Sequence, residues 1–508
     1  MKSIASALVC AAVATGVALA SRPEGQCAAV ADAWCNAQRP GAPSPINCDS
    51  SVAEGPLVTL FDSDAQGGPP QWRCYSRETL NPSRTKYVSG TGYCTRNSSL
   101  TDELRNCAAG ITTNPTPVFM HGETASNTNT TYPCIRIPSI VRLPESDELL
   151  AFAECRRWVG DGCAPVGGAP DDADSTLGRT DWRDVCTKTS TDGGRTWGAL
   201  VVIANCTMQP TPVVIPPEAG TSQPPTIVLH GNRCPASTVR PSGNVQIVSR
   251  DGGKTWSQPE DLLRFLGPDV DGADVGPGVG LRLDSDHPVA PGRLLFIGHR
   301  GAYVHDFVWY SDDDAATWKV SDTSTFAGMD EAQLVQVPAH AAAALGAPAG
   351  AVMANMRSDH LNKSCDCRAF AISTDGGASF SDVQWDSALI SPVCQATIIS
   401  GASPSGNGSA LYFANPASKS QRAQGTVRAS FNGAASWPEA RLIASSAFAY
   451  SCLAAPSAHS PEPSLGLLWE TDGGSFQCLG PSCRVVFSSI PTALLAGSAA
   501  GSPGPLAA

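Results

Sequence analysis

The sequence predicts an all-β protein whose main part is a six-bladed β-propeller. A turn motif, STDGGRTW at Ser190–Trp197, returns as SRDGGKTW, SDDDAATW, STDGGASF and SFNGAASW. Successive copies are 59, 62, 62 and 57 residues apart, counted over Asp192, Asp251, Asp313, Asp375 and Asn432. Strand-like stretches such as VQIVS and HDFVWYS precede the turns. Repetition of small sheets at near-constant spacing is typical of a propeller, whereas solenoid repeats are shorter and more regular.

Each turn motif is expected to shape a tight hairpin. Asp192 can accept hydrogen bonds from its own local backbone, Gly193 and Gly194 allow positive φ, and Trp197 begins the next strand. We interpret the turns as structural braces between strands of one blade and not as catalytic groups. Five turns between residues 132 and 490 leave room for six blades, one of which lacks the motif.

The two ends of the chain differ in composition from the repeats. Residues 1–20 resemble a signal peptide, with Lys2, an apolar stretch and a small-x-small site at residues 18–20. Residues 21–115 hold six cysteines and no repeat, which predicts a small cysteine-rich module. Residues 116–490 form the predicted propeller, and the low-complexity residues 491–508 are expected to be a disordered tail.

Cysteine usage indicates export. Of nineteen cysteines, Cys10 would leave with the signal peptide, and the remaining eighteen suggest disulfides. No Cys/His spacing suits zinc, and the sequence shows no cage for calcium. Five sequons fit a secreted glycoprotein of the extracellular space or a lysosome-like secretory compartment, namely Asn97, Asn129, Asn205, Asn362 and Asn407.

The charge and hydropathy of the chain argue against nucleic-acid binding and against a membrane span. A net charge of −12 argues against nucleic acid, so any anion-binding site must be a local basic cluster. After removal of the signal peptide no apolar run is long enough to predict a membrane span.

The turns, their six-bladed spacing and the stretch CIRIPSIVRLPESDELLAFAECRR together resemble the sialidase (neuraminidase) family over residues 132–490. The resemblance implies an exo-α-sialidase, a glycoside hydrolase that removes terminal sialic acids from glycoproteins, gangliosides or oligosaccharides. It also implies that neither a metal nor an organic cofactor is required.

The family binds the substrate carboxylate with three arginines. Arg136 in IRIP, Arg357 in VMANMRSDH and Arg422 in NPASKSQRAQGTVR match them. The planar guanidinium suits this role because it binds a carboxylate in a bidentate way and stays charged. Arg428 competes for the third position, but it lies in the strand that leads into the fifth turn, so we favour Arg422.

The family nucleophile is a tyrosine, which Tyr450 in SSAFAYSCL matches. A phenol titrates near 10 and therefore needs an adjacent base, for which Glu331 in GMDEAQLVQV is the match. Glu470 in GLLWETDGG matches the glutamate that orients the first arginine. Arg156 resembles a further arginine of the site; we prefer it to Arg157 because it lies twenty residues after Arg136.

The resemblance implies that the general acid is an aspartate on a loop after that last arginine. Spacing from Arg156 favours Asp161, whereas counting back from the first turn suggests Asp181. The intervening stretch looks like an insertion and holds further aspartates, Asp171, Asp172 and Asp174. We favour Asp161 over Asp181.

Three alternatives stay open at this point. A trans-sialidase would use the same residues with a sugar acceptor in place of water. A non-catalytic glycan-binding propeller would keep the turns but needs none of the catalytic candidates. Related 2-keto sugar acids share the carboxylate, so the arginines do not distinguish them from sialic acid.

Overall fold

The computed structural model describes residues 115–496 apart from short breaks and the longer gaps 159–181, 359–364 and 472–482. It also describes the backbone of β1 (Leu57–Asp62) and β2 (Gln71–Ser76), which pair antiparallel. The chain divides into two units, Met1–Asn114 and Pro115–Ala508. The predicted signal peptide, the side chains of the six cysteines of the N-terminal module and the tail beyond residue 496 lie outside the described part of the chain.

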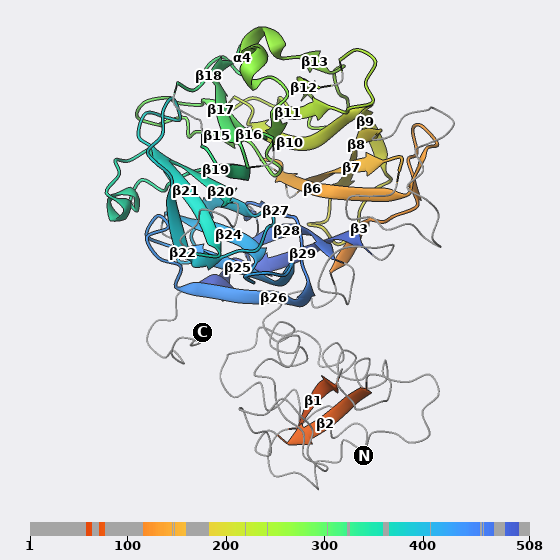
Figure 1. Ribbon diagram of the computed structural model, residues 1–508, viewed down its shortest axis with the longest axis vertical. Helices are drawn as coiled ribbons and strands as arrows, with labels where there is room; N and C mark the ends of the chain where they lie inside the picture. Colours follow the sequence, from red (N-terminus) through yellow and green to blue (C-terminus); the bar gives the residue numbers. More distant parts are fainter. Residues whose placement is uncertain are drawn as a thin grey trace. The chain divides into compact units, whose positions relative to one another are not determined.

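Six antiparallel sheets of the second unit form the predicted six-bladed propeller (Figure 1). The first three blades are β6 (Cys134–Arg142), β7 (Leu149–Arg156), β8 (Arg183–Ser190), β9 (Val201–Ala204); β10 (Thr207–Ile215), β11 (Thr226–Arg233), β12 (Asn244–Ser249), β13 (Glu260–Asp261); and β14 (Asp274–Val275), β15 (Leu281–Arg282), β16 (Leu294–Arg300), β17 (His305–Ser311), β18 (Lys319–Val320).

Blades four to six continue in chain order. They are β19 (Met329–Gln336), β20 (Val352–Ser358), β21 (Cys367–Ser373), β22 (Gln384–Ile390); β23 (Thr397–Ala402), β24 (Ser409–Pro416), β25 (Ala423–Ser430), β26 (Glu439–Ala447); and β27 (Ser451–Ala454), β28 (Ser464–Thr471), β29 (Arg484–Pro491) with β3 (Thr116–Phe119). The short elements outside the blades are β4 (Glu123–Thr124), β5 (Thr131–Tyr132), α4 (Leu263–Val270), η2 (Ala342–Leu345) and η3 (Thr492–Leu495).

The sixth blade closes the ring. Its outer strand is β3, which pairs with β29 through Phe119↔Val485 and Pro117↔Val486. In the other five blades the turn motif joins the third and fourth strands, for example β8 and β9. In the sixth blade those two strands come from opposite ends of the propeller sequence. The missing sixth turn is therefore a consequence of ring closure.

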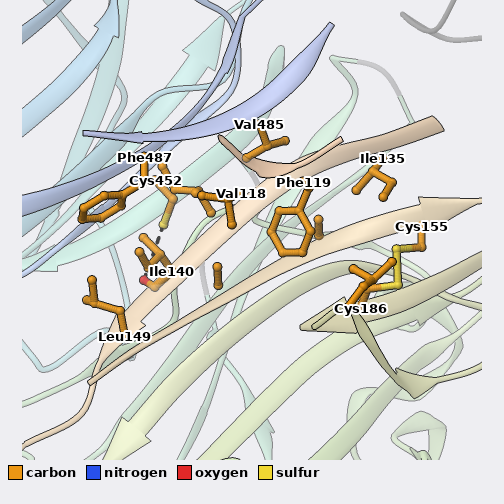
Figure 2. Packing of buried hydrophobic residues seen from close by; sticks show 14 of the residues in the cluster. Val118, Phe119, Ile135, Ile140, Leu149, Cys155, Cys186, Cys452, Val485 and Phe487 are labelled. Atoms are coloured by element: carbon orange, nitrogen blue, oxygen red, sulfur yellow. Dashed lines mark hydrogen bonds between the residues drawn. A yellow bond between two sulfur atoms is a disulfide. The ribbon is translucent and has the colours of Figure 1, made fainter. Parts of the chain in front are cut away.

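Apolar side chains fill the space between neighbouring blades. Each of six buried clusters combines residues of two consecutive blades. Figure 2 shows the cluster between the sixth and first blades, where Val118 and Phe119 of β3 pack with Val485 and Phe487 of β29 and with Ile135 of β6. The ring is thus held mainly by burial of apolar surface between sheets that share no hydrogen-bonded ladder.

The turn motifs share one hydrogen-bond pattern. In the first, Gly194 N donates to Ser190 Oγ at 2.9 Å, and Thr196 N and Oγ1 donate to the two Asp192 oxygens at 2.9 and 2.7 Å. These hydrogen bonds lower the pKa of Asp192 to about 2. The aromatic residue also reaches beyond its own blade: Trp197 packs edge-on against Phe487 of the sixth blade at 5.6 Å. The motif therefore braces neighbouring blades as well as strands of one blade.

A segment of the third blade crosses the centre of the ring. Val279 packs against apolar clusters that involve four other blades. Gly280 N donates to Pro212 O at 2.9 Å, Ala332 N to Gly276 O at 3.1 Å and Gln395 Nε2 to Pro277 O at 3.1 Å. We call residues 276–280 the central plug.

The described residues line a cavity of about 610 Å³ beyond the central plug. Its wall is made by the last residues of inner strands, among them Arg142 of β6, Gln336 of β19 and Ala454 of β27. Among the described residues, none of the sequence-predicted site candidates lines this cavity, so the site that they form lies elsewhere.

Disulfides are present, as predicted. Cys155 pairs with Cys186, Cys206 with Cys234, and Cys365 with Cys367. Cys134 and Cys483 are also disulfide-bonded. Two buried cysteines, Cys394 and Cys452, are free, so the even count did not imply that every cysteine is paired.

Two further sequence features are visible in the described part of the chain. The sequon residues Asn129 and Asn205 are exposed. Within that part, no helix combines the length and the apolar character needed to cross a bilayer.

Candidate functional site

The candidate site lies at one end of the inner strands of the propeller, where several strands begin or end together. Arg136 is the third residue of β6 and Glu331 the third of β19. Arg357 is next to last in β20, which runs antiparallel to β19 and so ends where β19 begins. Arg422 directly precedes β25 and Tyr450 directly precedes β27. Residues from four blades therefore converge, although they span more than three hundred positions of sequence.

Bulges redirect two of these strands at the site. The register between β6 and β7 shifts after Arg136, and the next residue, Ile137, has a φ of 59°. The register between β19 and β20 shifts between Met329 and Ala332, around Glu331. A bulge turns a side chain away from the regular alternation of a strand and is common next to active sites.

Tyr450 and Glu331 are in direct contact. The Tyr450 hydroxyl donates a short hydrogen bond to Glu331 Oε1, and both side chains are buried. Arg357 Nη1 lies 2.5 Å from Glu331 Oε2 and 3.2 Å from the Tyr450 hydroxyl. The predicted nucleophile, its predicted base and the second predicted arginine thus form one hydrogen-bonded group.

The environment keeps Tyr450 protonated in the ligand-free protein. Burial raises the pKa of its phenol well above 10, and the Glu331 carboxylate raises it further, while Arg357 and Arg422 act in the opposite direction. A phenol in this state is a weak nucleophile. It becomes reactive only if its proton passes to a base, and Glu331 is in position to accept it.

Glu470 contacts Arg136, the arginine that the family resemblance assigns to it. Arg136 Nε and Nη2 donate to the two Glu470 oxygens at 3.0 and 2.9 Å. Glu470 also accepts the backbone N–H groups of Ile137 at 2.9 Å and Tyr450 at 3.3 Å. One carboxylate on β28 therefore fixes the first arginine and the backbone of the nucleophile.

Arg136 and Arg422 both flank the Tyr450 ring. The guanidinium carbons lie 5.2 and 5.1 Å from the ring centroid. Arg422 Nε and Nη2 donate to Val393 O at 3.4 and 3.2 Å. The competitor Arg428 is directed elsewhere, because its Nη1 donates to Asn415 Oδ1 at 3.2 Å within the fifth blade.

Arg156 lies beside this group. Its Nε and Nη2 donate to Glu154 Oε2 at 3.0 and 2.8 Å, and Glu154 is the cross-strand partner of Arg136. Its neighbour Arg157 points to Asp184, with Nη2 2.8 Å from Oδ2. The two arginines therefore have different partners, as alternation along a strand requires.

The candidates for the general acid lie outside the described residues. Asp161, Asp181 and the three aspartates between them all fall in the gap 159–181. The choice of Asp161 over Asp181 therefore stays a prediction.

Sequence reasoning missed three residues beside Arg357. Tyr303, between β16 and β17, accepts hydrogen bonds from Arg357, and Asp330 Oδ1 lies 3.8 Å from Arg357 Nη1. His299 Nε2 lies 3.8 Å from the same Asp330 oxygen. Asp330 could have been found from its position next to Glu331. No motif surrounds Tyr303 or His299, so the sequence carried no comparable signal for them.

The site combines positive charge with an acid–base pair. Three guanidinium groups surround a phenol that contacts a carboxylate, which suits an anionic ligand and a nucleophilic step. Among the described residues, no group of histidine, cysteine, aspartate and glutamate side chains is arranged to hold a metal ion.

Comparison with known families identifies the repeats. Residues 178–459 match the BNR repeat-like domain family, which is more than half of the chain. The chain belongs to the BNR repeat-like domain family. The resemblance to sialidases is confirmed by curated relatives that are named sialidases.

The curated relatives carry sialidase names. The chain is 31% identical to a sialidase of Micromonospora viridifaciens over 385 residues, which cover 70% of this chain and 53% of the relative. It is 29% identical to human Sialidase-4, over 54% of this chain and 55% of the relative. The BNR chain thus spans about half the length of the curated relatives it matches.

Solved structures share the fold of this BNR protein. A leech intramolecular trans-sialidase aligns with a TM-score of 0.56 at 16% identity, covering 77% of this chain and 72% of the other. The microbial sialidase Hz136 aligns with a TM-score of 0.51 at 20% identity, covering 71% and 66%. At these identities the likeness extends to the propeller fold alone.

Proposed function

We propose that this protein is an exo-α-sialidase that hydrolyses terminal sialic acids from glycoproteins, glycolipids or oligosaccharides with retention of configuration. The observation that carries the proposal is the hydrogen-bonded group of Tyr450, Glu331 and Arg357, flanked by Arg136 and Arg422. The sialidase names of the relatives support the same reading.

The arginines would bind the substrate carboxylate. Sialic acid carries this group on its anomeric carbon, so fixing it also places that carbon. Arg136 and Arg422 lie close to the Tyr450 ring and Arg357 close to its hydroxyl. A carboxylate held among them brings the anomeric carbon within reach of the phenol oxygen.

Tyr450 would act as the nucleophile. A carboxylate nucleophile would be repelled by the substrate carboxylate. A phenol is neutral while it keeps its proton, so it can approach the anomeric carbon without this repulsion. Glu331 accepts that proton as the phenol oxygen bonds to the anomeric carbon, and the bond to the aglycone oxygen breaks as that oxygen takes a proton from the acid. A water then attacks the same carbon and gives one proton to the deprotonated acid. The bond from carbon to the phenol oxygen breaks, and that oxygen regains its proton from Glu331.

The remaining parts of the proposal rest on the sequence. We assign the general acid to Asp161, with Asp181 as the alternative. We also propose that the protein is exported through the secretory route, because its disulfides are typical of oxidising compartments.

The proposed function is tested with Tyr450→Phe. The substitution keeps the buried ring and removes the hydroxyl, so hydrolysis of sialyl-methylumbelliferone should fall by at least about 10³-fold, the scale expected when covalent catalysis is lost. Thermal unfolding should show that the variant is folded. Turnover close to that of the wild type would refute the mechanism.

The matched control is Tyr310→Phe, on β17 of the third blade, where the ring packs against Arg293. This variant should keep full activity.

Adding labelled lactose to the wild-type reaction separates hydrolysis from transfer, because a trans-sialidase would yield labelled sialyl-lactose. A wild-type protein that binds sialosides without turnover would instead support a glycan-binding propeller.

A further inference from the structure

The three site arginines, Arg136, Arg357 and Arg422, each use the Nε and Nη2 edge of the guanidinium to bind an acceptor of the protein. In each guanidinium, Nε and Nη2 donate to an acceptor of the propeller: Glu470 for Arg136, the Val393 carbonyl for Arg422 and the Tyr303 hydroxyl for Arg357. Engaging this edge fixes the plane of the guanidinium and leaves the Nη1 side to face other groups.

The contact between Arg357 and Tyr303 is the tightest of the three by distance. Nη2 lies 2.6 Å and Nε 3.0 Å from the same phenol oxygen. On the other side of the guanidinium, Nη1 contacts Glu331 and Tyr450. Arg357 is therefore held between the proposed catalytic pair and a tyrosine from a different blade.

We propose that Tyr303 is a positioning residue for substrate-carboxylate binding, acting through Arg357. This inference rests on the proposed function and extends it to a residue of the third blade. Tyr303 fixes the orientation of Arg357, as Glu470 does for Arg136. Removing its hydroxyl leaves two N–H donors of Arg357 without their acceptor and frees the guanidinium to rotate toward Glu331.

The backbone at Tyr303 is shaped for this contact. Gly301 has a φ of 71° and Tyr303 a φ of 56°, a left-handed conformation that bulky residues seldom adopt. Conformations of this kind persist where the surrounding structure holds them, often at functional sites. Here the loop between β16 and β17 directs the phenol to Arg357 at the end of β20.

A neutral acceptor suits this position. Arg357 already faces Glu331 at 2.5 Å, and Asp330 lies 3.8 Å from the same nitrogen. A third carboxylate here would offset the positive charge that an incoming carboxylate needs. The phenol holds Arg357 without adding negative charge, whereas the acceptor that holds Arg136 is the carboxylate of Glu470.

The inference is tested with Tyr303→Phe and two competitive ligands, the unsaturated glycal of sialic acid and its methyl ester. Arg357 pairs with the carboxylate of the acid but not with the neutral ester. The substitution should raise the inhibition constant of the acid about tenfold, the effect of one hydrogen bond to a charged group. The constant of the ester should change less than about twofold.

Two controls separate this effect from general damage. Tyr310→Phe makes the same change in the same blade away from the site and should leave both constants unchanged. Tyr303→Phe should unfold in a single transition whose midpoint lies at most slightly below that of the wild type, because Tyr303 is only partly buried. Loss of folding, or equal weakening of acid and ester, would overturn the positioning role.

The outcomes also separate this inference from the proposed function. If the wild type binds acid and ester equally, arginine recognition of the carboxylate fails and both proposals fall. If the wild type prefers the acid and hydrolyses sialosides, but Tyr303→Phe binds both ligands as the wild type does, only the role of Tyr303 is refuted.

Discussion

At Asp306 the protein buries a carboxyl group that the proposed mechanism does not use. Asp306 lies on β17 opposite His299 of β16, is fully buried, and neither of its oxygens has a hydrogen-bond partner among the described residues. Burial raises its pKa well above the usual value, and the carboxylate of Asp330 adds to this shift, while Arg368 opposes it. The folded protein thus keeps a proton that the unfolded chain releases.

We therefore predict that Asp306→Asn stabilises the protein near neutral pH. Because the folded pKa of Asp306 is raised, its favourable contribution is complete below the unfolded pKa of about 3.9 and is lost as pH rises toward the folded pKa. Asparagine carries no such proton. The variant should be more stable than the wild type by about 1–3 kcal/mol at pH 7.

The measurement is thermal unfolding of both proteins across the acid to neutral range. The advantage of Asp306→Asn should shrink as the pH approaches 4. An advantage that is the same at every pH would show that deprotonation of Asp306 is not its source.

Residues of the candidate site were predictable where a local motif surrounds them. Glu331, Tyr450 and Glu470 each lie in a short stretch that matches a family pattern, and the structure places them in one hydrogen-bonded group with Arg136 and Arg357. Tyr303 was not predictable. Its partner is far along the chain in another blade, and the contact depends on how two blades pack, which local sequence does not encode.

At the scale of the element, the turn motif combines local hydrogen bonding with contact between blades. The sequence predicted the hairpin because serine, aspartate and glycine have clear local preferences. It did not predict that the turn would touch the preceding blade. Gly194 shows this best, because a Cβ at this position would lie 2.1 Å from Cε1 of Phe487.

We predict that Gly194→Ala destabilises the protein more than Gly193→Ala. Both glycines have positive φ, 89° and 72°, so both substitutions carry a backbone cost of about 1–2 kcal/mol. Only Gly194→Ala also forces a methyl group against Phe487, which adds about 1–3 kcal/mol. Urea unfolding of the two variants measures the difference.

Gly193→Ala is the matched control, because no described atom beyond its two chain neighbours lies within 4 Å of a Cβ placed there. Combining Gly194→Ala with Phe487→Leu should recover part of the loss, since the smaller side chain makes room. Equal destabilisation by the two alanine variants would mean that the contact with Phe487 of the sixth blade does not contribute to the difference in the free energy of unfolding.

At the scale of the whole molecule, six similar apolar interfaces join consecutive blades into a closed ring. The number of blades followed from the spacing of the turns, but the way the ring closes did not, because β3 contains no turn and is only four residues long. A strand this short gives no periodic signal. Its side chains Val118 and Phe119 are nevertheless buried in the cluster between the sixth and first blades.

We predict that Phe119→Ala weakens the whole propeller. Phe119 is fully buried, and loss of a buried phenylalanine side chain costs about 3–5 kcal/mol. Because this residue joins the two ends of the ring, the lower stability should appear for all blades together as a lower midpoint of urea unfolding. Val289→Ala, at a position 56% exposed, is the control and should leave the midpoint nearly unchanged.

The pairing of β3 with β29 has a consequence for how the protein is made. Translation delivers β3 before every other blade strand and β29 after all of them. β3 therefore has no strand to pair with until β29 has been synthesised and has left the ribosome. Until then Val118 and Phe119 lack their partners from the sixth blade, so the nascent chain exposes these apolar side chains to non-native contacts.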